Sequence, residues 1–255
     1  MKTLAIDVGG TGLKAALLDE TGAMIGERVR IETPYPCPPQ TLIAALRALT
    51  SGLPAFDRVS AGFPGMVRAG KIIEVPALSR ARLGGAPDPD LVRAWSGFEL
   101  ANALEAAFGC PVRLANDADV QGCAVARGDG LEFVMTLGTG CGTAMFWQGQ
   151  LLPHLELSHG PFRNGQTYDE QLGDVTRQRV GNTRWRRRVR KAIAAFDAML
   201  LFDHVYLGGG NAKYLRGEDL GPKATIVPNV AGILGGIKLW EQQWDREDLR
   251  SAQSR

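Results

Sequence analysis

One local pattern occurs twice in this chain, about 128 residues apart. Each copy has an apolar strand, a turn of glycine and threonine, a further strand and a polar turn that contains glycine. The first copy spans residues 3–8, Gly9-Gly10-Thr11-Gly12, residues 13–18, the turn at 19–22 and residues 23–30; the second spans residues 132–137, Gly138-Thr139-Gly140 with residues 141–143, residues 144–147 and the turn at 148–149. A repeat of this kind predicts two similar α/β lobes with a ligand cleft between them. Chance similarity of two glycine hairpins is the alternative.

The first glycine turn lacks the spacing of the common nucleotide loops. A dinucleotide or Walker loop needs GxGxxG or GxxxxGK[ST] and a following helix, whereas here a strand pattern follows. One interpretation is a hairpin whose N–H groups and Thr11 hydroxyl hold phosphate, with Asp7 beside it to hold a hydrated Mg²⁺. The other is a purely structural hairpin with a chance acid.

Asn116-Asp117-Ala118-Asp119 lies where a short strand pattern passes into a helix pattern expected over residues 118–127. Helix starts leave N–H groups unpaired, so such a junction suits polar chemistry, and Asp117 is a candidate catalytic base. An N-cap without catalysis is the alternative, because Asn and Asp are preferred caps. We interpret Asp119 as structural.

Glu156 and His159 stand three residues apart beside a glycine, a pair that can hydrogen-bond a polyol. A solvated loop is the alternative. Further on, residues 184–202 predict a helix with an apolar stripe, and its other face carries Arg184, Arg187, Arg188 and Lys191. Such a face either is a solvated surface or binds a polyanion.

The remaining pattern predicts ordinary α/β elements. We expect an extended proline-rich segment over 33–39, an irregular loop over 76–90 and a last helix that Asn229 caps. Helices are expected at 40–50 and 97–108, and strands at 58–63, 204–207 and 224–227, the first ending in Phe63-Pro64-Gly65 and the second in Gly208-Gly209-Gly210. We place the lobes at 1–115 and 116–237, with a terminal helix at about 238–255 packed back on the first lobe.

Composition narrows the class of protein. With 45% hydrophobic and 22% charged residues and a formal net charge of +2, the chain is that of an ordinary soluble protein. No apolar run is long enough to span a membrane, and no signal-peptide pattern follows Met1, so we expect a cytoplasmic protein with no membrane partner. The four cysteines form no CxxC pair, which favours reduced thiols.

Six motifs together resemble the ROK sugar kinases of the actin-like ATPase superfamily. They are DVGGTG at 7–12, GFPG at 62–65, ANDAD at 115–119, TLGTG at 136–140, ELSH at 156–159 and YLGGG at 206–210. The motifs occur in the family's order and cover nearly the whole chain. The short length and the PYPCPP segment at 34–39 look most like the polyphosphate/ATP glucokinase branch.

The resemblance implies two α/β lobes of the actin-like, ribonuclease H-like kind and a kinase that phosphorylates a hexose, glucose O6 first of all. Asp117 would be the general base. Pro64, Gly65, Asn116, Glu156 and His159 would bind the sugar, and Asp7 would hold Mg²⁺ through water. Gly9, Gly10, Thr11, Gly12, Lys14, Gly138, Thr139 and Gly140 would bind the phosphates of ATP or polyphosphate, Gly208, Gly209 and Gly210 would border the adenosine, and the Arg184, Arg187, Arg188 and Lys191 face would hold polyphosphate.

Several positions depart from the family pattern. No cysteine follows Cys141, so we expect no zinc; Ser158 replaces the usual glycine of the E-x-G-H motif, and residues 76–79 lack the usual sugar-binding Asn. These changes keep another sugar or a small polyol open, and also a ligand-binding protein without catalysis. A sugar-responsive repressor is disfavoured, since no helix-turn-helix precedes the first hairpin, so we expect no nucleic-acid partner. We expect a homodimer.

Overall fold

The computed structural model describes residues 1–227 and 231–242. The chain divides into two compact units, one formed by residues 1–120 and 232–255 and the other by residues 121–231. The lobe boundaries expected from the sequence stay predictions. Residues 243–255 and Asn229, on which part of the expected terminal helix and its cap fall, lie outside the described residues.

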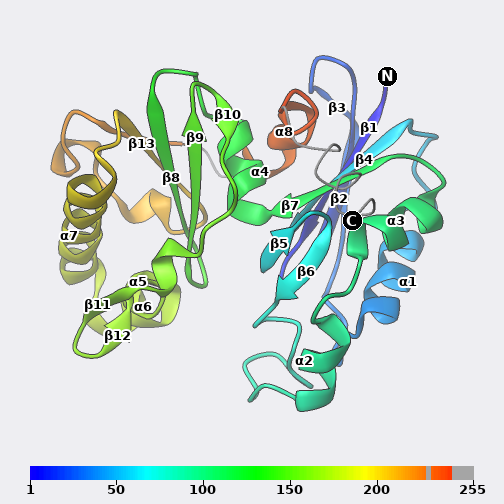
Figure 1. Ribbon diagram of the computed structural model, residues 1–255, viewed down its shortest axis with the longest axis horizontal. Helices are drawn as coiled ribbons and strands as arrows, with labels where there is room; N and C mark the ends of the chain where they lie inside the picture. The colour runs from blue at the N-terminus through cyan, green and yellow to red at the C-terminus, as the bar shows by residue number, and fades with distance from the viewer. Residues whose placement is uncertain (228–230, 243–255) are drawn as a thin grey trace, which may run out of the picture. The chain divides into compact units, whose positions relative to one another are not determined.

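The first unit is built on a five-stranded sheet with the order β3-β2-β1-β4-β7 (Figure 1). Its strands are β1 (Thr3–Val8), β2 (Leu13–Leu18), β3 (Met24–Ile31), β4 (Arg58–Phe63) and β7 (Val112–Asn116). β1, β2 and β3 form an antiparallel meander, whereas β4 runs parallel to both β1 and β7. A small hairpin of β5 (Met66–Arg68) and β6 (Lys71–Glu74) follows β4.

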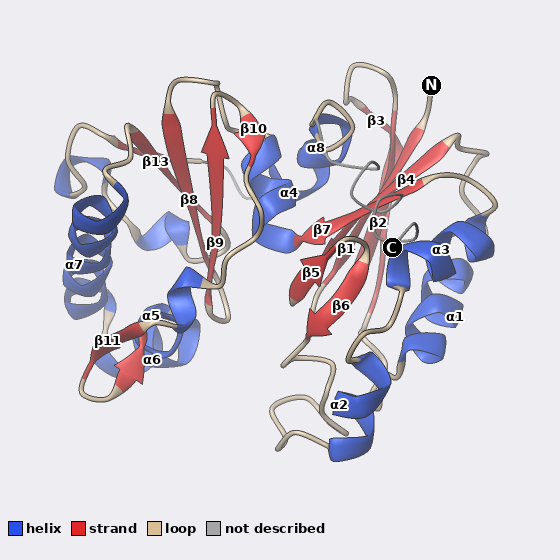
Figure 2. Ribbon diagram, in the orientation of Figure 1, coloured by secondary structure: helices blue, strands red, loops and turns tan. Residues whose placement is uncertain are grey.

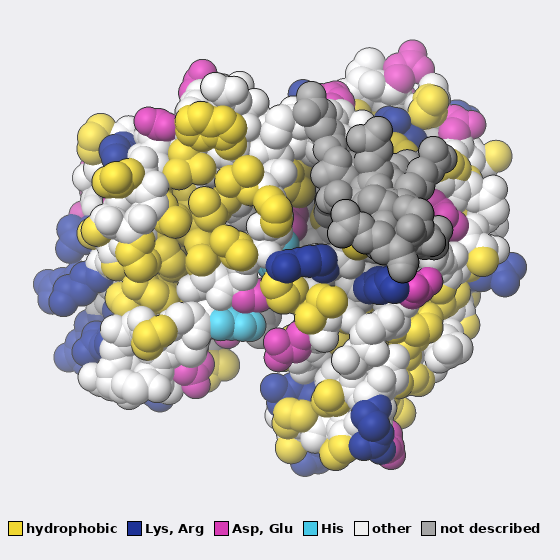
Figure 3. Space-filling model, viewed as in Figure 1, with side chains coloured by type: hydrophobic (Ala, Val, Ile, Leu, Met, Phe, Trp, Pro, Cys, Tyr) yellow, Lys and Arg dark blue, Asp and Glu magenta, His cyan; other side chains and the backbone are white. Residues whose placement is uncertain are grey.

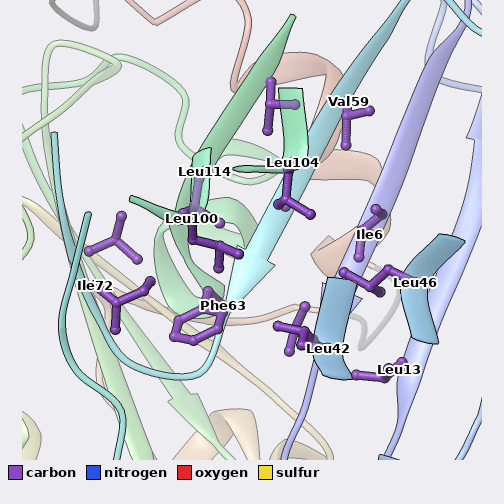
Figure 4. Packing of buried hydrophobic residues seen from close by; sticks show 14 of the residues in the cluster. Ile6, Leu13, Leu42, Leu46, Val59, Phe63, Ile72, Leu100, Leu104 and Leu114 are labelled. Carbon is purple, nitrogen blue, oxygen red and sulfur yellow. The ribbon is translucent and has the colours of Figure 1, made fainter. Parts of the chain in front are cut away.

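One face of this sheet is covered by α1 (Pro39–Thr50) and α3 (Leu100–Phe108). α1 turns Leu42 and Leu46 inward and α3 turns Leu100 and Leu104 inward, at the spacing of one helix face. Figure 4 shows these side chains meeting the sheet residues Ile6, Leu13, Val59, Phe63 and Leu114. α2 (Pro89–Trp95) adds Trp95, whose indole N–H donates to the Cys37 carbonyl oxygen at 3.0 Å.

The opposite face of the same sheet is covered by α8 (Ala231–Lys238) and the residues after it. The Ser60 hydroxyl donates to the Gly236 carbonyl oxygen at 2.5 Å and accepts from the Trp240 indole at 2.8 Å. The guanidinium groups of Arg58 and Arg113 each lie 4.8 Å from the Trp240 ring. Residues 236–242 therefore cover this face of the sheet that contains β1.

The second unit holds another five-stranded sheet, with the order β10-β9-β8-β13-β14 (Figure 2). Its strands are β8 (Leu131–Leu137), β9 (Cys141–Trp147), β10 (Gln150–Leu151), β13 (His204–Gly208) and β14 (Ala224–Ile226). β8, β9 and β10 are antiparallel, and β13 runs parallel to β8 and β14. α4 (Asp117–Cys123) follows β7 directly and leads from the first unit into the second.

Three helices pack on this sheet: α5 (Tyr168–Leu172), α6 (Asp174–Val180) and the long α7 (Asn182–Leu200). α7 buries the apolar stripe that the sequence predicts, Trp185, Val189, Ala192, Ile193 and Phe196. The Trp185 indole also donates to the Leu172 carbonyl oxygen at 2.7 Å, which joins the start of α7 to the end of α5. Short elements complete the unit: β11 (Pro161–Arg163), β12 (Gln166–Thr167) and the 3-10 turns η1 (Leu157–His159), η2 (Ala212–Tyr214) and η3 (Gly217–Asp219).

The two sheets have the same strand order and the same strand directions, which confirms the internal repeat. In each, a three-stranded antiparallel meander pairs through its first strand with two parallel strands. The α/β fold with two actin-like lobes is thereby confirmed in its elements. No helix within the described residues is long and apolar enough to span a membrane.

Several short elements were not expected from the sequence. The β5-β6 hairpin lies just after Phe63-Pro64-Gly65, and α2 begins at the end of the segment that was expected to be an irregular loop. Asp88 caps α2 by accepting the N–H groups of Asp90 and Leu91. Elements of two to seven residues give too few periods for an apolar pattern to be recognised.

Close packing of α8 on the first unit leads to a stability prediction. A Cβ at Gly235 would lie 1.7 Å from the Val120 carbonyl oxygen, so the backbone must move to accept it. We expect Gly235→Ala to lower the free energy of unfolding by about 2 kcal/mol, the usual cost of overpacking, measured as the midpoint of urea unfolding. Gly52→Ala is the control, because a Cβ there meets nothing within 4 Å. Equal midpoints for the two variants would contradict the prediction.

Candidate functional site

The turn between β1 and β2 is held by its own backbone and by the proline-rich segment. Gly9 N–H donates to the Gly12 carbonyl oxygen at 3.0 Å, and the Thr33 hydroxyl donates to the Gly9 carbonyl oxygen at 2.5 Å. The Tyr35 hydroxyl donates to the Gly10 carbonyl oxygen at 2.7 Å. A Cβ at Gly10 would lie 3.2 Å from the Ala77 side chain. The turn is therefore fixed against residues 33–35 and 76–79, with Thr11 exposed.

Asp7 and Lys14 face each other across the β1-β2 pair. The Lys14 ammonium lies 2.8 Å from an Asp7 carboxylate oxygen, and about a third of each side chain is exposed, 33% and 28% respectively. No cluster of three or more metal-binding side chains occurs among the described residues. A single half-buried carboxylate fits a hydrated Mg²⁺ held through water and through the phosphates of a donor, as Mg²⁺ keeps most of its water in proteins.

Asn116, the last residue of β7, joins two candidate segments. Its Oδ1 accepts the Ala118 N–H at 2.8 Å, and its Nδ2 donates to the Gly65 carbonyl oxygen at 3.0 Å. Only a glycine fits at 65, because a Cβ would lie 2.3 Å from the Glu74 carbonyl oxygen. Asn116 thus caps α4 and ties the loop that follows β4, the loop with Pro64, to the β7 end of the sheet.

Asp117 is the first residue of α4, and its Oδ1 accepts the Ala118 N–H at 2.8 Å. Its side chain is half-buried, whereas Asp119 is only 2% exposed. The burial of Asp119 agrees with its interpretation as a structural residue. The register places Asn116 beside Phe63 and Gly62 beside Asp7, so Asp117 follows the same sheet edge at which β1 ends.

The second glycine turn, between β8 and β9, is fixed by side chains from other elements. Gly138 N–H donates to the Gly140 carbonyl oxygen at 2.9 Å. The Asn211 Nδ2 donates to the Gly138 carbonyl oxygen at 2.9 Å, and Asp169 accepts the Cys141 N–H at 2.7 Å. A Cβ at Gly140 would lie 2.0 Å from the Asp169 carboxylate. Asn211 and Asp169 were not singled out from the sequence.

Gly208, Gly209 and Gly210 lie next to this second turn. Gly209 has a φ of +84°, and a Cβ there would lie 2.4 Å from the Leu137 carbonyl oxygen. Asn211 N–H donates to that same oxygen at 2.8 Å. The structure therefore brings together two of the segments predicted to contact the phosphoryl donor, Gly138 to Gly140 and Gly208 to Gly210.

Glu156 lies between two histidines just before η1. One carboxylate oxygen is 3.4 Å from His154 Nε2 and the other is 3.7 Å from His159 Nε2. The His154 side chain is 3% exposed, that of Glu156 21% and that of His159 45%. Burial raises the pKa of Glu156, but the hydrogen bond and charge of His154 and the charge of His159 outweigh it, so the pKa lies below its ordinary value.

His154 is a residue that the sequence analysis missed. It stands two positions before Glu156, at the spacing that places alternate side chains on one side of an extended segment. Ser158 is also buried, at 1% exposure, and its hydroxyl has no hydrogen-bond partner among the residues that the structure describes. The Ser158 departure from the family motif therefore places a buried hydroxyl in η1, directly before His159.

Four basic residues of α7 follow the predicted face. Arg184, Arg187 and Lys191 are exposed, whereas Arg188 is half-buried. Figure 3 shows Lys and Arg side chains gathered along the edge of the second unit at which α7 lies. The sequence predicted this face and its polarity, but not that Arg188 turns partly inward.

Comparison with known proteins identifies the class of protein to which this chain belongs. A profile of the ROK family matches residues 3–155. The chain is 27% identical over 248 residues to a polyphosphate glucokinase of Mycobacterium tuberculosis, covering 90% of this chain and 88% of that protein. It is 37% identical over 157 residues to an N-acetylmannosamine kinase of Escherichia coli, covering 60% of this chain and 50% of that protein.

A solved structure agrees with these sequences. The inorganic polyphosphate/ATP-glucomannokinase from Arthrobacter sp. strain KM superposes with a TM-score of 0.77 at 28% identity, covering 92% of this chain and 96% of that one. The chain belongs to the ROK family. Within that family it falls in the class of the sugar kinases, as these relatives do.

The histidines around Glu156 lead to a titration prediction. Replacing His154 by Gln removes one of the groups that oppose the effect of burial, so we expect the pKa of Glu156 to rise. Because that pKa is lowered in the folded chain, the ionised carboxylate stabilises the fold at neutral pH, and this contribution is lost as the pH falls through the folded pKa. In His154→Gln the loss begins at a higher pH.

The measurement is the carboxyl ¹³C shift of Glu156 followed by NMR from neutral to acid pH. His204→Gln is the matched control in the same unit, because His204 contacts Thr225, at 2.9 Å, on another edge of the sheet. An unchanged titration of Glu156 in His154→Gln, or an equal shift in His204→Gln, would show that His154 does not act on this carboxylate.

Proposed function

We propose that this chain transfers a phosphoryl group from ATP or inorganic polyphosphate to a hydroxyl of a hexose, with glucose O6 as the first candidate. The observation that carries the proposal is the position of Asp117. It follows β7 at the sheet edge where the β1-β2 glycine turn and the Pro64-Gly65 loop also lie. The similarity to a polyphosphate glucokinase over 90% of the chain supports the same reaction class.

In the proposed reaction, Asp117 accepts the proton of the sugar hydroxyl as that oxygen attacks the terminal phosphorus of the donor. The bond from phosphorus to the leaving oxygen breaks, and the shortened donor leaves. Phosphoryl transfer needs positioning and charge neutralisation more than covalent help. One carboxylate is therefore enough as a base, and the N–H groups of the glycine turns suit the donor phosphates.

Asp7 would hold Mg²⁺ through water, and the metal would supply neutralisation of the phosphate charge. Lys14, 2.8 Å from Asp7, would add a positive charge at the same turn. Gly9 to Gly12 and Gly138 to Gly140 would contact phosphates, and Gly208 to Gly210 would border an adenosine. These assignments, the homodimer and the cytoplasmic location belong to the proposal.

For the sugar, Glu156 and His159 are the proposed ligands of the ring hydroxyls. The lowered pKa of Glu156 keeps its carboxylate ionised, which makes it a strong hydrogen-bond acceptor. Pro64, Gly65 and Asn116 would border the sugar in the first unit. Since both amide atoms of Asn116 bind backbone groups, its proposed contribution is chiefly to hold the loop and Asp117 in place.

A different acceptor is the second candidate. The relative at 37% identity phosphorylates, by its name, N-acetylmannosamine, and Ser158 puts a buried hydroxyl next to the proposed sugar ligand His159. Residues 76–79 contact the first glycine turn through Ala77 rather than supplying an Asn. A hexose other than glucose, or a small polyol, would fit these differences.

The donor and the acceptor are tested together by a coupled kinase assay. The purified chain is incubated with glucose, mannose or N-acetylmannosamine, each with Mg-ATP and separately with long-chain polyphosphate. We expect turnover with at least one donor and the highest kcat/KM for glucose. Sugar binding by calorimetry with no turnover for any pair would favour a ligand-binding protein instead.

A variant tests the base. We expect Asp117→Asn to fold normally and to lose about 10² to 10⁴ of the wild-type kcat, the usual contribution of a general base. The sugar KM should change little, because the amide keeps the size of the carboxyl group. Circular dichroism and the melting temperature check the fold. Asp129→Asn, the same change at an exposed position, is the control, and near-wild-type turnover of Asp117→Asn would remove Asp117 from this role.

A further inference from the structure

The part of the second unit between β11 and the end of α7 has an uneven charge. Residues 161–200 hold nine basic side chains and four acidic ones. The basic residues are Arg163, Arg177, Arg179, Arg184, Arg186, Arg187, Arg188, Arg190 and Lys191. They do not all lie in one place, so their contacts decide which of them form a site.

Several of these side chains are engaged elsewhere. Arg177 pairs with Asp174 at 2.7 Å, and Arg186 donates to the Tyr214 carbonyl oxygen at 3.3 Å. Arg190 lies 3.8 Å from the Asp219 carboxylate. Arg186 and Arg190, four residues apart on α7, thus point toward η2 and η3.

Arg184 and Arg188 occupy a different face of α7, one turn apart. The half-buried Arg188 has an Nη1 atom that is removed from solvent and has no hydrogen-bond partner among the described residues. A buried guanidinium nitrogen without an acceptor is costly, so a bound anion that supplies the acceptor would stabilise it.

Two further arginines lie on elements packed around α7, and their charges act on Arg188. Arg163 ends β11 and Arg179 lies in the last turn of α6, and α6 packs on α7. Burial is the largest cause that lowers the pKa of Arg188, and the charges of Arg163, Arg179 and Arg184 lower it further. The Arg179 guanidinium is held 3.3 Å from the Thr176 hydroxyl.

No carboxylate of the three helices balances this cluster. α5, α6 and α7 carry Asp169, Glu170, Asp174 and Asp197. Asp169 accepts the Cys141 N–H, and Glu170 accepts the Thr167 N–H in a capping box. Asp174 pairs with Arg177, and Asp197 pairs with Lys223 at 2.9 Å. Among the described residues, the four arginines 163, 179, 184 and 188 have no ion-pair partner.

We propose that Arg163, Arg179, Arg184 and Arg188 form a binding pocket for a linear chain of phosphoryl groups, with the buried Arg188 nitrogen at its base. Guanidinium groups bind phosphate oxygens in pairs, and four positive charges without carboxylates suit a ligand with several charges in a row. The inference rests on the proposed function, in which polyphosphate is a donor. Compared with the polyphosphate face expected from the sequence, the proposed site keeps Arg184 and Arg188, leaves out the exposed Arg187 and Lys191, and adds Arg163 and Arg179.

The local aromatic residues favour an inorganic chain over a nucleic acid. Single strands are bound by stacking their bases on exposed rings. Here Tyr168, Trp185 and Phe196 are buried in the core of the unit, and Phe162 stacks on Tyr168 with ring centroids 4.5 Å apart. The pocket therefore offers charge without a stacking surface.

The test is calorimetric binding of tripolyphosphate to the full chain, with no sugar present. We expect tripolyphosphate to bind more tightly than orthophosphate, and its affinity to fall steeply as salt rises. Arg188→Gln and the double variant Arg163→Gln/Arg179→Gln should each weaken binding about tenfold or more, as expected for a lost charge-assisted hydrogen bond. The double variant changes only exposed side chains, so it guards against misfolding of Arg188→Gln.

Arg190→Gln is the matched control, because it removes one charge from the same helix outside the pocket. We expect it to change the affinity less than about twofold, as exposed charges contribute little. Unchanged binding in Arg188→Gln and in the double variant, or an equal loss in Arg190→Gln, would overturn the pocket. So would tighter binding of a single-stranded oligonucleotide of equal charge.

Two results separate this inference from the proposed function. If the chain binds tripolyphosphate through these arginines but phosphorylates no sugar with any donor, the proposed function is wrong, but the proposed pocket stands. If Arg188→Gln uses polyphosphate as a donor as well as the wild type does, the proposed pocket is wrong, but the proposed kinase activity stands.

Discussion

The parallel pairing of β1, β4 and β7 is the constraint on which the candidate residues of the first unit depend. Parallel strands end at one edge of a sheet, and the register sets Asp7 beside Gly62 and Phe63 beside Asn116. Because side chains alternate along a strand, a slip of one residue would turn Asn116 to the other face and break its bond to Gly65. The alignment of the acid, the loop and the candidate base thus follows from strand register.

The second unit reaches its geometry by a different means, the close approach of backbone segments. Gly140 and Gly209 leave no room for a Cβ, and Asn211, which follows Gly210, donates to the Leu137 and Gly138 carbonyl oxygens at the other turn. Asp169 fixes the start of β9 from α5. Rigid N–H dipoles of this kind need little reorganisation when they meet a charged group, which suits the proposed contact with a phosphoryl donor.

Charge is distributed in contrasting ways over the candidate groups. Asp7 lies beside the Lys14 ammonium, and Glu156 lies between the imidazole rings of His154 and His159. Arg163, Arg179, Arg184 and Arg188 have no ion-pair partner among the described residues, and the half-buried Arg188 is also partly desolvated. The carboxylates of Asp7 and Glu156 already have a basic neighbour, whereas the arginine cluster would be stabilised by a bound anion.

The sequence by itself determined the repeated glycine hairpins, the existence of the later strands and the basic helix, because apolar periodicity and glycine turns are local signals; the parallel pairing of those strands came from the tertiary structure. It also predicted that Asp117 stands at a strand-to-helix junction. Tertiary structure alone decided that Asn116 binds the Gly65 loop, that His154 lies against Glu156, and that the charges of Arg163 and Arg179 act on Arg188. These contacts join side chains to groups on other turns, strands or helices, and no local pattern encodes a meeting that depends on how those elements pack.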